Sequence, residues 1–127
     1  MLENVLLPAQ IKYKKARPQD IKRANELIER VGLSEIKNNK ATDISGGQQQ
    51  RAAIARSLIN TPKIILGDEA TGNLDSETSE NVYNLLKEIN QEYKSTFIVI
   101  THDDRIARKA DRIIEIKDGR IFSDNKN

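Results

Sequence analysis

Residues 44–75 constrain the fold more than any other part of this sequence, because glycine-rich turns there alternate with apolar segments of different lengths. Ser45, Gly46 and Gly47 precede a run with apolar residues at helical spacing, so residues 48–59 are predicted to form a helix capped by Ser45. A helix start presents unpaired N–H groups, and glycines without a Cβ let an anion approach them closely. This end of the helix is therefore a potential anion site.

A short strand followed by two acids comes next. Pro62 ends the helix, and residues 63–67 are a mostly apolar run that predicts a strand buried on both faces. Asp68 and Glu69 follow, and ligands of open α/β sheets lie at the carboxyl ends of the strands. The pair predicts a metal-binding acid and then a catalytic acid, although such a pair alone is more often a cap or loop feature. Residues 70–75, with a glycine and an asparagine, form a predicted turn.

A second predicted strand brings a histidine to the same region. The stripe of apolar residues over residues 76–93 predicts a helix, with Asp75 or Ser76 as its cap. Residues 96–101 are the next apolar strand, and His102 follows it directly. A strand, a helix and a strand in this order form a right-handed parallel unit. The two acids and His102 should therefore emerge at the same edge of the sheet, whereas a lone histidine is more often structural.

The amino-terminal part is mainly helical in this interpretation. Residues 1–11 form either a linker or a short helix, because Pro8 interrupts an apolar run. Pro18 suits the first turn of an amphipathic helix that ends at Gly32. Its predicted buried face consists of Ile21, Ala24, Leu27, Ile28 and Val31. The basic run over residues 12–23 predicts a solvated face rather than a contact with lipid headgroups or an acidic partner.

The carboxyl-terminal part predicts a short helix and a hairpin. The helix covers residues 103–110, and the hairpin covers residues 112–122 with its two-residue turn at 118–119. Residues 123–127 are polar and are predicted to be frayed.

Composition excludes several classes of protein. The 127 residues carry a formal charge of +2 and few aromatic side chains, which argues against nucleic-acid binding. The sequence has no cysteine, so it has neither a disulfide framework nor a thiolate metal site. No apolar stretch reaches the roughly twenty residues that cross a bilayer, so membrane association is expected to come through a partner.

Four motifs together resemble those of the ABC transporter ATPases. The sequence ISGGQQQR is similar to the family's signature motif, IILGDEAT to its Walker B strand with the following glutamate, and GNLD to its D-loop. His102 matches the histidine of the H-loop, and the four motifs occur in the family's order and spacing over nearly the whole chain. The GNLD sequence looks most like the subgroup that serves lipoprotein-release, macrolide-export and bacteriocin-export permeases.

The resemblance implies a partial P-loop NTPase fold of the α/β class. Residues 1–60 would form the helical subdomain with the signature motif, which touches the permease in this family. Residues 61–127 would form the Walker B half of a mainly parallel sheet flanked by helices. The sequence contains no G-x-x-x-x-G-K-[ST] loop, so the resemblance implies the carboxyl-terminal part of an ATPase, either cut for an experiment or encoded as a truncated reading frame.

The resemblance also assigns roles to individual residues. Asp68 would hold Mg²⁺, usually through water, Glu69 would be the general base or water-positioning group, and His102 would sense the γ-phosphate of ATP. Asp75 would lie at the interface between two ATPase subunits and link their sites. The signature residues would cover the nucleotide of the other subunit in a head-to-tail dimer; they are Ser45, Gly46, Gly47 and Gln48.

Two positions depart from the family pattern. Ala70 stands where proline is common, and Ile44 replaces a leucine. Both changes are conservative for packing, so neither is expected to abolish activity.

The leading hypothesis is therefore that the protein is the ATP-binding and ATP-hydrolysing subunit of an ABC transporter. This subunit would be peripheral on the cytoplasmic face of the cell membrane, and its partners would be a second ATPase subunit and a transmembrane permease. In isolation the chain is expected to self-associate or to swap domains, because apolar faces lack their cover. One alternative is a non-enzymatic module that binds a permease or a full-length ATPase. The other is an ATPase of DNA repair or chromosome maintenance, which the absence of a heptad pattern disfavours.

Overall fold

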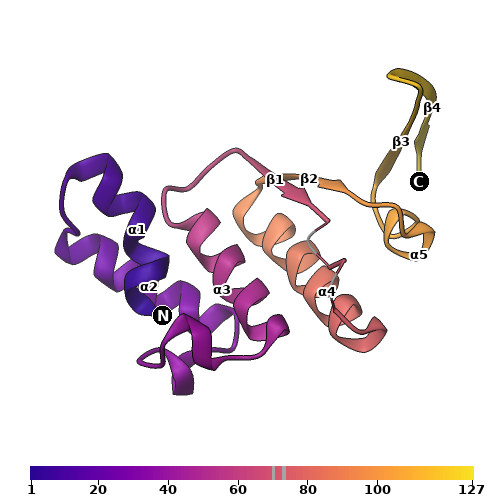
Figure 1. Cartoon of the computed structure of the whole chain (residues 1–127). Helices are drawn as coiled ribbons and strands as arrows, with labels where there is room; N and C mark the ends of the chain where they lie inside the picture. Colours follow the sequence, from indigo (N-terminus) through magenta and orange to yellow (C-terminus); the bar gives the residue numbers. More distant parts are fainter. Residues whose placement is uncertain (70, 73) are drawn as a thin grey trace.

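The computed structural model describes residues 1–69, 71–72 and 74–127, and Figure 1 shows its helices and strands along the chain. The first half contains α1 (Leu2–Tyr13), α2 (Pro18–Arg30), the 3₁₀ turns η1 (Ser34–Ile36) and η2 (Ala41–Asp43), and α3 (Gly46–Leu58). The second half contains β1 (Ile64–Asp68), α4 (Ser76–Tyr93), β2 (Thr96–Ile100), α5 (Asp104–Ala107), β3 (Arg112–Lys117) and β4 (Arg120–Lys126). No helix among these described residues is long and apolar enough to cross a bilayer.

The first segment is a helix rather than a linker, and it continues through Pro8. Val5, Leu6 and Ala9 are buried against the other helices, so tertiary packing offsets the backbone hydrogen bond that Pro8 cannot donate. Helix α1 ends at Tyr13, where Lys14 adopts a left-handed conformation with φ of 65°.

The start of α2 is fixed by an ion pair that the sequence did not predict. The backbone N–H of Arg17 donates to Asp20 at 2.9 Å, and the Arg17 guanidinium donates to both carboxylate oxygens at 2.9 and 2.8 Å. The same guanidinium stacks on the ring of Tyr13 at 3.4 Å from its centroid, so it joins the end of α1 to the start of α2. These hydrogen bonds lower the pKa of Asp20 to about 2.

Asp20→Asn is expected to destabilise the chain at neutral pH, and the loss should shrink in acid. The folded-state pKa of Asp20 is depressed below its ordinary value of 3.8, so its stabilising contribution is present above that pH and is lost as pH falls toward 2. Urea unfolding of both proteins at pH 7, 4 and 3 measures this convergence. Glu26→Gln, a change of an exposed acid in the same helix, is the matched control. A pH-independent difference between wild type and Asp20→Asn would contradict the prediction.

Helices α1 to α4 share one apolar core. Its largest fully buried side chains come from all four helices and from the turn after α2; they are Val5, Leu27, Ile28, Leu33, Leu58, Val82 and Ile89. The predicted face of α2 is confirmed except at Ile21, which is 41% exposed. This core crosses residue 60, because α4 belongs to it. The division between residues 1–60 and 61–127 therefore stays a proposal about the intact domain.

Strands β1 and β2 form a parallel pair in which Asp68 lies opposite Ile100. Ile65 and Phe97 point toward the core, whereas the other face of the pair carries exposed apolar side chains; they are Ile64, Leu66, Ile98 and Ile100. The prediction of a strand buried on both faces is therefore wrong for this chain. Among the described residues, helix packing covers one face of this two-stranded sheet.

Strands β3 and β4 form a separate antiparallel hairpin that projects at the far end of the molecule (Figure 1). Asp118 and Gly119 have φ of 48° and 72°, which confirms the predicted two-residue turn. The prediction of a frayed tail is wrong, because β4 extends to Lys126 and the Arg112 guanidinium binds Asp124 at 2.8 and 2.6 Å. Cross-strand pairing thus orders a polar segment that has no apolar periodicity.

Candidate functional site

Glu69 and His102 meet directly after the ends of the two parallel strands. The backbone N–H of Glu69 donates to the carbonyl of Ile100 at 2.9 Å, which continues the strand pairing by one residue. The Nδ1 atom of His102 lies 3.0 Å from Oε1 of Glu69, and both side chains are more than half exposed. The expectation that the strand ends bring the acid and the histidine to one edge is therefore confirmed in the geometry.

The backbone at Glu69 has a left-handed conformation with φ of 46°, which is uncommon for a residue with a side chain. The N–H of Gly72 donates to the Glu69 carbonyl at 2.9 Å and closes the turn. A Cβ at Gly72 would lie 3.3 Å from both Cβ and Oε2 of Glu69. Gly72 thus leaves room for the Glu69 carboxyl group, a role that the sequence pattern, which marked it as a turn residue, did not show.

The residues around His102 hold its backbone in place. Thr101 Oγ1 accepts a hydrogen bond from the Asp103 N–H at 3.0 Å, and Asp103 in turn accepts one from the Arg105 N–H at 2.9 Å as the cap of α5. The Arg105 side chain lowers the pKa of Asp103 to about 2, so this carboxylate is ionised at neutral pH. The sequence motifs do not mark Thr101 or Asp103, although an aspartate before a short helix is a capping signal.

Asp68 is exposed at the last position of β1. Within the described ranges, no three His, Cys, Asp or Glu side chains are grouped so that they could hold a metal ion by themselves. An exposed carboxylate at a strand end nevertheless fits Mg²⁺, which binds one or two carboxylates together with waters and phosphates. Ala70 and Asn73 lie outside the described residues, so the predicted turn over residues 70–75 is described only at its other positions.

Helix α3 begins at Gly46, two residues before the predicted start at residue 48, and Ser45 caps it as predicted. Ser45 Oγ accepts a hydrogen bond from the Gln48 N–H at 3.2 Å, and Gln48 Oε1 accepts one from the Ser45 N–H at 2.9 Å. This reciprocal capping box satisfies two backbone donors and fixes the path of the chain into the helix. Gly46 is exposed and Gly47 is buried.

Asp75, rather than Ser76, caps α4, because its carboxylate accepts a hydrogen bond from the Thr78 N–H at 3.1 Å. Hydrogen bonds from the Thr78 side chain and backbone hold the pKa of Asp75 below its ordinary value. The start of α4 lies beside the start of α3, since a Cβ at Gly46 would lie 3.3 Å from Leu74. The structure thus gathers the predicted residues in two places, the strand ends and the two helix starts.

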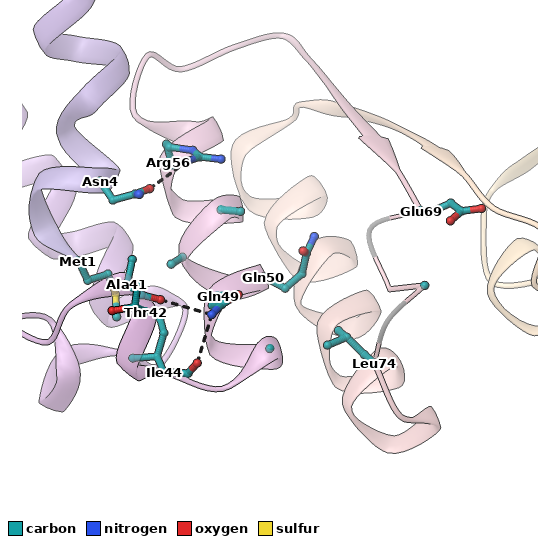
Figure 2. A pocket seen from close by; sticks show the side chains of 14 residues that line it. Met1, Asn4, Ala41, Thr42, Ile44, Gln49, Gln50, Arg56, Glu69 and Leu74 are labelled. Carbon is teal, nitrogen blue, oxygen red and sulfur yellow. Dashed lines mark hydrogen bonds between the residues drawn. The ribbon is translucent and has the colours of Figure 1, made fainter.

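A pocket of about 500 Å³ opens between these two places (Figure 2). Gly46 and Leu74 line it from the helix starts, and Glu69 lines it from the end of β1. The opposite wall comes from α1 and α3, where the Arg56 guanidinium donates to Asn4 Oδ1 at 3.0 Å (Figure 2). The pocket therefore joins the end of β1, a helix start and polar side chains from the amino-terminal helices.

Comparisons with known proteins agree with the motifs. A model of the ABC transporter family matches residues 2–72. The lipoprotein-releasing system ATP-binding protein LolD 1 of Rhodopseudomonas palustris is 46% identical over 119 residues, which are 94% of this chain and 53% of that protein. LolD of Wigglesworthia glossinidia brevipalpis is 46% identical over 126 residues, which are 98% of this chain and 54% of that protein.

Solved structures show the same likeness. The dimeric structure of MJ0796, described as a bacterial ABC transporter cassette, has a TM-score of 0.80 at 47% identity and covers 98% of this chain and 55% of that one. A post-hydrolysis state of the same cassette, bound to ADP and Pi, has a TM-score of 0.80 at 46% identity and covers 98% of this chain and 55% of that one.

These matches confirm the predicted partial P-loop NTPase fold of the ABC ATPase type and the resemblance to the lipoprotein-release group. The chain spans about half the length of the curated relatives it matches. On the family model and on this level of identity, the chain belongs to the ABC transporter family.

Proposed function

We propose that this chain is part of an ATP-binding and ATP-hydrolysing subunit that powers a membrane permease from the cytoplasmic face of the cell membrane. The observation that carries the proposal is the contact of Glu69 with His102 at the ends of two adjacent parallel strands. Phosphoryl transfer to water needs an oriented water molecule and donors at the γ-phosphate, with little covalent work by the protein. At this sheet edge the carboxylate can orient the water, and the imidazole can bind the γ-phosphate.

Each side chain would have a separate part in the reaction. The Glu69 carboxylate would orient the attacking water and accept its proton. The His102 imidazole would bridge Glu69, through Nδ1, and a phosphate oxygen, through Nε2, which would hold the two groups in register. Asp68 would hold Mg²⁺, an ion that neutralises phosphate charge when bound.

The helix starts support a composite site between two subunits. The exposed capping box at Ser45 and Gln48 presents the positive end of α3 without a lysine beside it, and Asp75 lies at the neighbouring start of α4. We infer that Ser45, Gly46, Gly47 and Gln48 cover the nucleotide of a second ATPase subunit in a head-to-tail dimer. The solved MJ0796 cassette is a dimer, which is consistent with this arrangement.

The 127-residue chain by itself is expected to bind Mg-ATP weakly. Glu69, His102 and the signature residues contact the γ-phosphate end in the proposal, and the sequence contains no Walker A loop to cradle the β- and γ-phosphates. Titration calorimetry of the chain with Mg-ATP should give no saturable heat in the micromolar range. A micromolar dissociation constant would contradict this division of the site, and the full-length protein is the positive control.

A second candidate is a non-enzymatic module that binds a permease or a full-length ATPase. The exposed apolar face of β1 and β2 favours this alternative, because such faces are typical of binding surfaces. The genomic sequence upstream discriminates between the two functions. An in-frame Walker A sequence would support the ATPase subunit, whereas a true start at Met1 would support the binding module.

A further inference from the structure

Gly47 lies against the side chain of Thr78 in the same chain. A Cβ built on Gly47 would lie 2.6 Å from Cγ2 of Thr78, closer than real Cβ atoms approach another heavy atom. Gly47 is buried, so a larger residue at this position could not turn toward solvent. The absence of a side chain at position 47 is thus required by packing within the chain, independently of any ligand.

Thr78 takes part in both helix starts. Its backbone N–H donates to the Asp75 carboxylate at 3.1 Å as part of the α4 cap, while its methyl group faces Gly47 at the start of α3. Leu74 makes a similar but looser contact, since a Cβ at Gly46 would lie 3.3 Å from its Cδ2. Thr78 is therefore a direct connection between the buried glycine of α3 and the aspartate that caps α4.

We propose that Thr78 is a positioning residue, which fixes Gly47 of the signature motif relative to Asp75 so that the two helix starts move as one unit. The packing part of this inference stands on the geometry alone, and its consequence for nucleotide binding rests on the proposed function. A shift of α3 during ATP binding would then carry Asp75 with it, because a gap at the methyl contact would forfeit packed van der Waals contacts.

A pair of double mutants tests the contact in the 127-residue chain. Gly47→Ala is expected to lower the melting temperature by roughly 5–15 °C, since overpacking a close contact strains both helices. Adding Thr78→Ser, which removes the facing methyl group, should recover at least half of that loss. Adding Thr78→Val, which keeps the facing methyl group and replaces the hydroxyl with a second methyl group, should recover nothing. Equal melting temperatures for the two double mutants would overturn the packing part of the proposal.

Thr78→Ser and Thr78→Val also separate positioning from capping in the full-length protein. Serine keeps the hydroxyl that lowers the pKa of Asp75 but loses the methyl group, whereas valine does the reverse. In a Glu69→Gln background with saturating ATP, Thr78→Ser should raise the protein concentration for half-maximal dimerisation about 10-fold. Each dimer contains the contact twice, and a roughly 3-fold weakening at each contact multiplies to about 10-fold. Thr78→Val should stay near the reference protein.

The Glu69→Gln protein, which is the reference, separates a failure of the proposed function from a failure of the positioning role of Thr78. If Glu69→Gln alone shows no ATP-dependent dimer in size-exclusion chromatography, the proposed function is wrong. If the reference protein dimerises and both Thr78 variants match it, Thr78 has no positioning role. If Thr78→Val weakens dimerisation while Thr78→Ser does not, the hydroxyl at Asp75 is the important group and the methyl contact is not.

Discussion

Replacing Glu69 with Gln in the full-length protein is expected to lower kcat for ATP hydrolysis by about 10²- to 10⁴-fold and to leave ATP-dependent dimerisation intact. The amide has nearly the shape of the carboxylate, so it can still occupy the space that Gly72 leaves beside Glu69. It cannot accept a proton from water at neutral pH. Binding and turnover should therefore separate, and phosphate release at saturating ATP, measured beside light scattering of the dimer, tests this separation.

Glu77→Gln is the matched control for this experiment. Glu77 is an exposed acid in the first turn of α4, so its replacement removes the same charge from the same part of the molecule. We expect its kcat to stay within about two-fold of wild type, because an exposed surface charge acts weakly through solvent. Persistent hydrolysis in Glu69→Gln would remove Glu69 from its catalytic role and leave the fold assignment untouched.

The placement of Glu69 and His102 at one edge of the sheet could be predicted because chain order indicates it, although their 3.0 Å contact could not. A strand, a helix and a strand in sequence form a right-handed parallel unit, so residues that follow the two strands emerge at one edge of the sheet. The Ser45 cap and the turn at residues 118–119 could be predicted because the preferences of the residues involved are local. In each of these cases one rule of chemistry or topology connects the residues.

The contact between Gly47 and Thr78 could not be predicted in the same way. It depends on how two helix starts separated by about thirty residues pack against each other, and neither local propensity nor apolar spacing determines this packing. The exposure of Ile21 likewise does not follow from its place in the apolar pattern of α2. The ordered tail depends on the pairing of Arg112 with Asp124 across the hairpin.

The exposed face of β1 and β2 shows a different limit of sequence-based prediction. An apolar run indicates a strand, but it does not indicate which other segment covers each face of that strand. Leu66 lies next to Ile98 in the parallel register, with Ile64 and Ile100 further along the same face. Burial of one such side chain contributes about 1.5–3 kcal/mol. A second copy of the chain could supply that burial, so the isolated 127-residue chain is expected to self-associate at micromolar concentration.

Leu66→Lys is expected to convert this assembly to monomers, because the lysine would place a charge in the centre of the apolar contact. Ile11→Lys is the matched control, since Ile11 and Leu66 are each 74% exposed but Ile11 lies on α1, away from the sheet. A third variant, Phe122→Lys, changes an exposed side chain of β4 in the hairpin. Multi-angle light scattering of the wild type and the three variants at one concentration gives the comparison. If Phe122→Lys dissociates the assembly and Leu66→Lys does not, the hairpin is the contact surface. A monomeric wild-type chain would show that this exposed face does not drive association at all.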